Sequence, residues 1–162
     1  MNDDRFIQRD RMRFIRNSTS ANLCYLGILF NVFYFVNLYQ SDVGTYYYQI
    51  FIGASIVYNL LFLLVVFLAS EAVKNYVKSY SYLLAAIGAM QVVRVFYIPM
   101  NAHAAMTAVN GVDVPVMGDG QFYLLTAFLL ISAACLLVSA AVNFKKCQEL
   151  SEHMKTLEAQ KA

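Results

Sequence analysis

The sequence predicts an all-α integral membrane protein: a bundle of four transmembrane helices, preceded by an N-terminal interfacial amphipathic helix and followed by a C-terminal cytoplasmic helical extension. Three observations predict this fold class. Of the 162 residues, 60% are hydrophobic and only 14% are charged. The apolar residues form four blocks, each close to the about 20 residues that a helix needs to cross a bilayer. Basic residues flank the blocks on one side only, which is typical of membrane proteins.

Polar residues at the ends of the blocks divide the chain into three parts. Residues 1–19 form a basic segment, residues 20–144 a transmembrane domain and residues 145–162 a tail. Within the domain we expect four spans and one outer loop, which are residues 21–39, 48–69, 80–100 and 122–144 for the spans and 101–121 for the loop.

In the basic segment, apolar pairs such as Phe6 and Ile7 alternate with arginines. This pattern is typical of a helix that lies on a membrane surface, and each basic residue there adds about 1 kcal/mol of attraction to anionic headgroups. The expected anchoring residues are Arg5, Arg9, Arg11, Arg13 and Arg16.

The distribution of basic residues predicts the orientation. Lys74 and Lys78 lie in the connection between the second and third spans, and the tail holds four lysines, whereas the first connection and the outer loop contain no Lys or Arg. Because basic flanks stay in the cytoplasm, we expect a multi-pass protein of the cell membrane with both termini cytoplasmic. The formal net charge of +2 is then explained by topology and anionic lipid, and no nucleic-acid partner is expected.

Arg94 is the one charged residue inside the expected spans. Asn31, Asn59, Gln91 and Ser132 each lie about halfway along their own span, so polar groups from all four helices share a depth near that of Arg94. Polar side chains in lipid bond one another across helices, at roughly 0.6 to 2 kcal/mol each. We therefore expect an intramembrane polar layer, which either fixes the packing of the helices or lines a path for a solute or ion.

The outer loop contains a hairpin signal, Asn110–Gly111, between short runs of valine. Pro99 lies shortly before it, and a proline there predicts the end of the third helix. We expect the loop to cap the bundle. Small residues in the third and fourth spans, such as Gly88 and Ala133, predict that these helices pack closely on each other or on a partner.

In the tail, Cys147, Leu150, Met154 and Leu157 recur in a 3-4-3 pattern that resembles the apolar seam of a coiled coil. Two heptads are too short to form a stable helix alone. The pattern therefore indicates a partner, although a solvated helix would carry it as well.

Residues suited to catalysis or to cofactor ligation are absent from the spans. His103 and His153 both lie outside them, so no histidine pair can ligate haem there. Cys24, Cys135 and Cys147 are widely spaced and contain no Cys-x-x-Cys pair. No span contains Asp or Glu as a proton-coupling site. We expect no enzymatic activity, no cofactor and no metal.

Two classes of function fit these observations. In the favoured one, the protein is a non-enzymatic accessory or scaffold subunit of a larger membrane assembly such as a transporter. In the alternative, it is a small homo-oligomeric channel or transporter for an anion or polar solute, with Arg94 and the layer of Asn31, Asn59 and Gln91 along the path. The expected partners are a bilayer with anionic headgroups and either another membrane protein or further copies of this chain.

Overall fold

The computed structural model describes residues 15–39, 49–109 and 111–161. These residues form helices and one small β-hairpin, which lies between the last two helices. The elements are α2 (Ser18–Tyr39), α4 (Gln49–Lys74), α5 (Ser79–Tyr97), α6 (Pro99–Ala104), β1 (Met106–Val109), β2 (Val112–Pro115) and α7 (Asp119–Lys161). Four helical segments are long and apolar enough to cross a membrane, with α5 and α6 together forming one of them. The expectation of a helical chain with four long apolar helices is confirmed.

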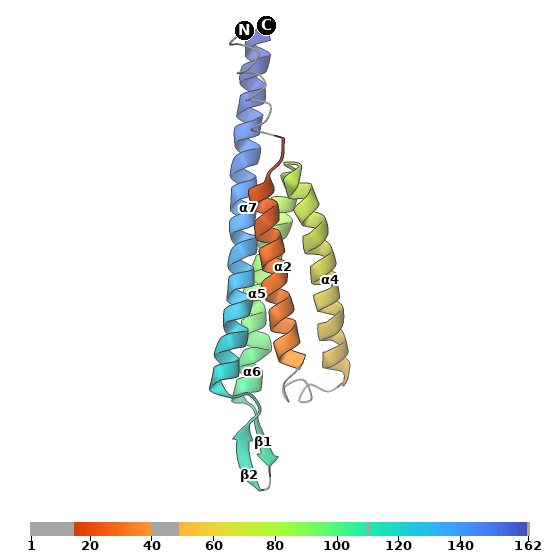
Figure 1. Cartoon of the computed structure of the whole chain (residues 1–162), viewed down its shortest axis with the longest axis vertical. Helices are drawn as coiled ribbons and strands as arrows, with labels where there is room; N and C mark the ends of the chain where they lie inside the picture. Colours follow the sequence, from red (N-terminus) through yellow and green to blue (C-terminus); the bar gives the residue numbers. More distant parts are fainter. Residues whose placement is uncertain (1–14, 40–48, 110, 162) are drawn as a thin grey trace.

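The four long helices run side by side along one axis (Figure 1). Helix α7 packs along α2 and α5, and α2 also packs along α4. The start of α2, the α4–α5 turn and the far part of α7 lie at one end of the bundle, which we call the terminal end. The hairpin β1–β2 lies at the other, which we call the hairpin end.

The helix boundaries follow from local chemistry. The Asn17 side-chain oxygen accepts a hydrogen bond from the backbone N–H of Ser20 at 3.3 Å, so Asn17 caps the N-terminus of α2. Helix α5 ends at Tyr97, and Pro99 is at the start of α6, where its missing N–H costs no helical bond. The expected break near Pro99 is confirmed. Helix α7 continues to Lys161 and includes the predicted tail.

Two apolar clusters form the core, one in each half of the bundle. The cluster of the terminal half includes Cys24, Phe62, Val66, Leu84 and Leu136. The cluster of the hairpin half includes Tyr34, Leu38, Met117, Leu125 and Leu129. A layer of polar side chains from α2, α4 and α5 is also buried in the bundle, and it includes Asn31, Asn59, Gln91 and Arg94.

Glycine lets α5 approach α7 closely at one point. A Cβ atom added to Gly88 would lie 2.9 Å from the Leu137 Cγ and 3.3 Å from the Ala133 carbonyl oxygen. Gly27 plays the same role for α2, because its added Cβ would lie 3.0 Å from the Leu136 Cδ2. The small residues therefore bring helix backbones together, as the sequence predicts.

The predicted outer loop forms α6, the hairpin and the first turn of α7. Strands β1 and β2 are antiparallel, with Val109 opposite Val112, and Gly111 adopts a φ of 82° in the turn. The base of the loop closes the hairpin end, where Ala102 and Met117 are fully buried. The hairpin itself projects away from the helices (Figure 1), and all four residues of β2 are exposed. The expectation that the whole loop caps the bundle is therefore wrong for the hairpin.

Candidate functional site

Arg94 on α5 is the centre of the polar layer. Its side chain is only 7% exposed. Nη1 donates hydrogen bonds to the Asn31 Oδ1 at 3.0 Å and to the Gln91 Oε1 at 2.9 Å. Nη2 donates to the Asn59 Oδ1 at 3.3 Å. One guanidinium thus connects side chains from α2, α4 and α5.

The three amides also bond one another. The Asn31 Nδ2 donates to the Asn59 Oδ1 at 3.2 Å, and the Gln91 Nε2 donates to the Asn31 Oδ1 at 2.9 Å. The remaining amide nitrogen, the Asn59 Nδ2, donates to the Ser55 carbonyl oxygen one turn away at 2.8 Å. All three amides are buried, and a buried polar group without a partner costs roughly 1 to 3 kcal/mol. The layer satisfies them within the chain.

The backbone arrangement explains why these residues meet. Gln91 lies one turn before Arg94 on the same face of α5. Asn31 and Asn59 lie near the middle of α2 and α4, which run side by side. Residues at equal depth on neighbouring helices face each other when both are turned toward the bundle axis.

Two tyrosine rings enclose the guanidinium. The Arg94 Cζ lies 4.8 Å from the ring centroid of Tyr34 and 4.5 Å from that of Tyr58. Both distances are within the range of a cation–π attraction, which is stronger where water is excluded. Sequence analysis did not find these residues. Their positions in the sequence could have revealed them. Tyr34 and Tyr58 lie inside expected spans and not at the ends of the spans, where an aromatic belt would lie.

The charge of Arg94 is held without a carboxylate among the described residues. Glu71 on α4 accepts bonds instead from Tyr25 at 3.0 Å and Lys74 at 3.2 Å near the terminal end. Arg94 therefore depends on amide oxygens and aromatic faces. The layer therefore places one arginine side chain among neutral amides and aromatic rings.

Ser132, the fifth residue of the expected layer, lies elsewhere. Its hydroxyl donates to the Gly27 carbonyl oxygen at 2.8 Å and makes no hydrogen bond to Arg94 or the amides. The expectation for Ser132 is corrected for a simple reason: depth along a span can be counted from the sequence, but the rotation of a helix about its axis cannot. Ser132 instead fastens α7 to α2.

A second polar cluster, which sequence analysis missed, joins the helices at the terminal end. The Asn143 Nδ2 on α7 donates to the Ser81 Oγ at 2.8 Å and to the Val77 carbonyl oxygen at 3.2 Å. Its Oδ1 accepts from the Asn17 Nδ2 at 3.0 Å. Lys146 donates to the Asn17 Oδ1 at 3.1 Å. Asn143 therefore connects the first residues of α2 and α5 to α7.

The α4–α5 turn belongs to this cluster. Tyr76 has a φ of 60°, a left-handed conformation that is uncommon for a residue with a side chain. The Cys147 thiol donates to the Tyr76 carbonyl oxygen at 3.1 Å, and the Asn17 N–H donates to the Lys74 carbonyl oxygen at 2.9 Å. Partial burial raises the pKa of the Tyr76 hydroxyl above its ordinary value, so this hydroxyl stays protonated at neutral pH.

Of the expected lipid-anchoring residues, the four at positions 5, 9, 11 and 13 lie outside the described residues, and Arg16 is exposed just before α2. Among the residues that the structure describes, no three His, Cys, Asp or Glu side chains gather as metal ligands. His103 is occupied at the base of the loop, where it stacks on Phe122 at 4.6 Å and approaches Asp119 at 3.7 Å.

Among the described residues, the layer around Arg94 joins side chains of α2, α4 and α5 through hydrogen bonds. Comparisons with protein-family models, with curated proteins and with solved structures found no match to this chain.

Proposed function

We propose that the chain is a non-enzymatic, multi-pass protein of the cell membrane that serves as an accessory or scaffold subunit of a larger membrane assembly such as a transporter. In this proposal α2, α4, α5 with α6, and the first part of α7 cross the bilayer. Both termini and the α4–α5 turn lie in the cytoplasm, and the hairpin lies on the opposite side.

The outer surfaces of the helices support insertion in a bilayer. Large apolar side chains on α4 and α5 are more than half exposed, among them Leu60, Leu64, Phe67, Val93 and Phe96. A soluble monomer rarely exposes apolar side chains along whole helices, whereas lipid covers them without cost. The charges favour the stated orientation. Lys74 and Lys78 flank the α4–α5 turn, which lies at the terminal end (Figure 1), and Lys146 donates to Asn17 just before α2.

The main observation in favour of the subunit role is that the polar groups of the Arg94 layer bond one another and face no lumen. A solute path needs polar groups that face a lumen, but the guanidinium and all three amides are buried and bond one another. A buried polar network of this kind rigidifies the fold and specifies one arrangement of helices. A rigid bundle with an apolar outer surface, a projecting hairpin and a protruding helix is suited to binding other subunits.

Purification from the native membrane tests the proposal. The chain is extracted in a mild detergent, and the polypeptides that accompany it are identified together with their stoichiometry. We expect at least one different and larger membrane protein in fixed ratio to this chain. A homo-oligomer alone would contradict the subunit role. If reconstituted vesicles then showed a solute flux that Arg94→Ala abolished while the fold stayed intact, the channel or transporter alternative would replace our proposal.

A further inference from the structure

Lysines at the terminal end of the bundle differ in whether the chain itself occupies their charge. Lys74 forms a salt bridge within α4 at 3.2 Å, and Lys146 donates to the Asn17 Oδ1 at 3.1 Å. Lys78 and Lys145 are exposed, and no carboxylate of the described residues lies within ion-pair distance of either. The charge of these two lysines is therefore available to an anion from outside the described part of the chain.

An aromatic pair holds the Lys78 side chain where α5 meets α7. Lys78 immediately precedes α5, and its Nζ lies 4.7 Å from the ring centroid of Phe144 on α7, within the range of a cation–π attraction. Tyr82, one turn into α5, packs edge-to-face on the same ring at 6.0 Å and is 62% exposed. Because lysine has much rotamer freedom to lose, a stem that is already held binds an anion at a lower entropic cost.

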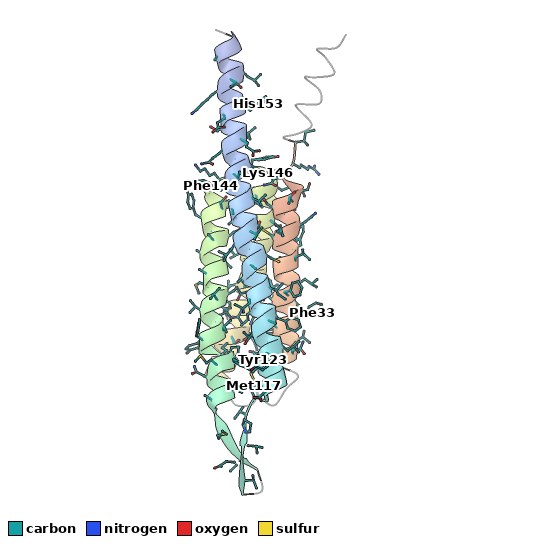
Figure 2. The ribbon with its side chains drawn as sticks, turned by 90° about the vertical axis from the view of Figure 1, so that its left-hand side faces the viewer. Phe33, Met117, Tyr123, Phe144, Lys146 and His153 are labelled. Carbon is teal, nitrogen blue, oxygen red and sulfur yellow. The ribbon has the colours of Figure 1, made fainter. Side chains whose placement is uncertain are left out.

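The depth of these residues is that of the lipid headgroups in the proposed orientation. Phe144 is the last residue of the fourth apolar block and Lys145 the first residue of the tail, while Lys78 directly precedes the third block. In Figure 2, Phe144 and Lys146 lie level with the ends of the other helices. The cytoplasmic leaflet carries anionic lipids, so the two lysines lie beside negatively charged phosphates.

We propose that Lys78, Tyr82, Phe144 and Lys145, which we call the headgroup site, bind one anionic phospholipid. The inference rests on the proposed insertion in a bilayer and is independent of the subunit role. The two ammonium groups donate to oxygens of the headgroup phosphate, for which lysine is a common ligand. The exposed tyrosine packs on the upper part of the lipid, since amphipathic rings favour the boundary between headgroups and acyl chains.

Fluorescence quenching by brominated lipids tests the headgroup site, because the chain contains no tryptophan. Tyr82→Trp places a single reporter in the site. Tyr123→Trp places a matched reporter at the hairpin end, where Tyr123 is 69% exposed and packs edge-to-face on Phe122 at 5.6 Å. No Lys or Arg occurs between residues 101 and 121 just before it.

Each full-length variant is purified and reconstituted in vesicles of phosphatidylcholine and phosphatidylglycerol, with bromine on the acyl chains of one lipid or the other. The ratio of the two quenching curves gives the preference of the lipid beside the reporter. We expect a preference for phosphatidylglycerol of roughly 5-fold or more at position 82, which corresponds to about 1 kcal/mol for each basic residue near anionic lipid. At position 123 we expect no preference.

Further substitutions in the Tyr82→Trp chain separate the charges from the ring. Lys78→Gln and Lys145→Gln should each lower the preference, and together they should lower it to that of the control reporter. Lys155→Gln, at an exposed lysine further along α7, should leave the preference unchanged, and Lys78→Arg should retain it. Phe144→Leu keeps both charges but removes the ring that holds Lys78, so we expect an intermediate preference.

Equal preferences at the two reporters, or a preference at position 82 that survives both lysine substitutions, would overturn the inference. Loss of the preference in inorganic phosphate, but not in chloride at the same ionic strength, would assign the two lysines to a soluble phosphate and overturn it as well. If brominated lipids quench neither reporter, the helices do not contact the bilayer, and the proposed membrane insertion fails together with the site.

Discussion

The Arg94 side chain contacts neutral amides and aromatic rings, so the planar shape of its guanidinium is as important as its charge. The planar guanidinium donates to three amide oxygens and lies between two aromatic rings. A lysine in its place would present one compact ammonium group, which can neither stack in the same way nor reach three acceptors in a plane.

We therefore expect Arg94→Lys to destabilise the protein nearly as much as Arg94→Ala. Both changes remove the guanidinium, which is the donor to the buried Gln91 Oε1 and one of two donors to each of the Asn31 and Asn59 Oδ1 atoms. A buried polar group without a partner costs roughly 1 to 3 kcal/mol. Thermal unfolding in detergent measures the effect, with Arg16→Lys and Arg16→Ala as controls at an exposed arginine. If Arg94 only extended its charge toward water, lysine would substitute for it, and wild-type stability of Arg94→Lys would refute the structural role.

Gln91→Leu should give a milder loss in the same assay. Arg94 would keep its bonds to Asn31 and Asn59, and leucine fills a similar volume in an apolar setting. Gln91 makes two hydrogen bonds in the layer, one from the Arg94 Nη1 and one to the Asn31 Oδ1. We expect a loss of about 1 to 3 kcal/mol, at about 0.5 to 1.5 kcal/mol for each bond. A loss as large as that of Arg94→Ala would show that the layer acts as an indivisible unit.

The sequence predicts part of this site and no more. Asn31, Asn59, Gln91 and Arg94 can be selected by depth alone, because a polar residue in a long apolar block is conspicuous. The direction in which each side chain points depends on the rotation of its helix about its own axis, and counting depth along a span does not give that rotation. That dependence explains why Ser132 was misplaced.

At the scale of elements, close helix contacts at glycine control the spacing of the bundle. Gly88→Ala should destabilise the protein by about 1 to 3 kcal/mol, the usual cost of overpacking, because the new Cβ would lie 2.9 Å from the Leu137 Cγ. Gly53→Ala on α4 is the matched control, since no atom lies within 4 Å of its added Cβ. There we expect no loss, or a gain of roughly 0.5 to 1 kcal/mol from helix propensity. Equal effects at the two glycines, measured by thermal unfolding, would contradict the close contact.

The positive charge of the N-terminal segment predicts that it binds anionic lipid. Replacing Arg9, Arg11 and Arg13 by Gln in a peptide of residues 1–17 should weaken its binding to anionic vesicles. At about 1 kcal/mol per arginine, the loss is on the order of 100-fold, and it should diminish as salt is added. Vesicle sedimentation measures it. Unchanged, salt-independent binding would show that the arginines do not anchor this segment to lipid.

The long apolar helices were predictable from the sequence, whereas the ends of the helices and the polar contacts between them were not. The four apolar blocks indicate four helices because each block has about the 20 residues that a helix needs to cross a bilayer. The projection of β1–β2 depends on the base of the loop, where His103 stacks on Phe122, and no spacing rule predicts that contact. The polar cluster around Asn143 was equally hidden, because Asn143 lies at the end of an apolar block and resembles a boundary residue.

At the scale of the whole molecule, the polar clusters around Arg94 and Asn143 form two levels along the bundle, and single contacts such as Ser132 to Gly27 lie outside them. One lies at mid-length around Arg94, and the other at the terminal end around Asn143. Apolar clusters occupy the space between and beyond them. If the bundle crosses a bilayer, the first level lies within the hydrocarbon and the second near the cytoplasmic headgroups. The structural role proposed for Arg94 depends on this placement.

Side-specific labelling of single cysteines tests that placement most directly. In a variant without the three native cysteines, Asn75→Cys reports on the α4–α5 turn, and Asn110→Cys reports on the expected outer loop, residues 101–121. A membrane-impermeant reagent added to intact cells should label position 110 and leave position 75 unlabelled until the membrane is permeabilised. Labelling of position 75 from outside, or protection of position 110, would contradict the four-span orientation on which the account rests.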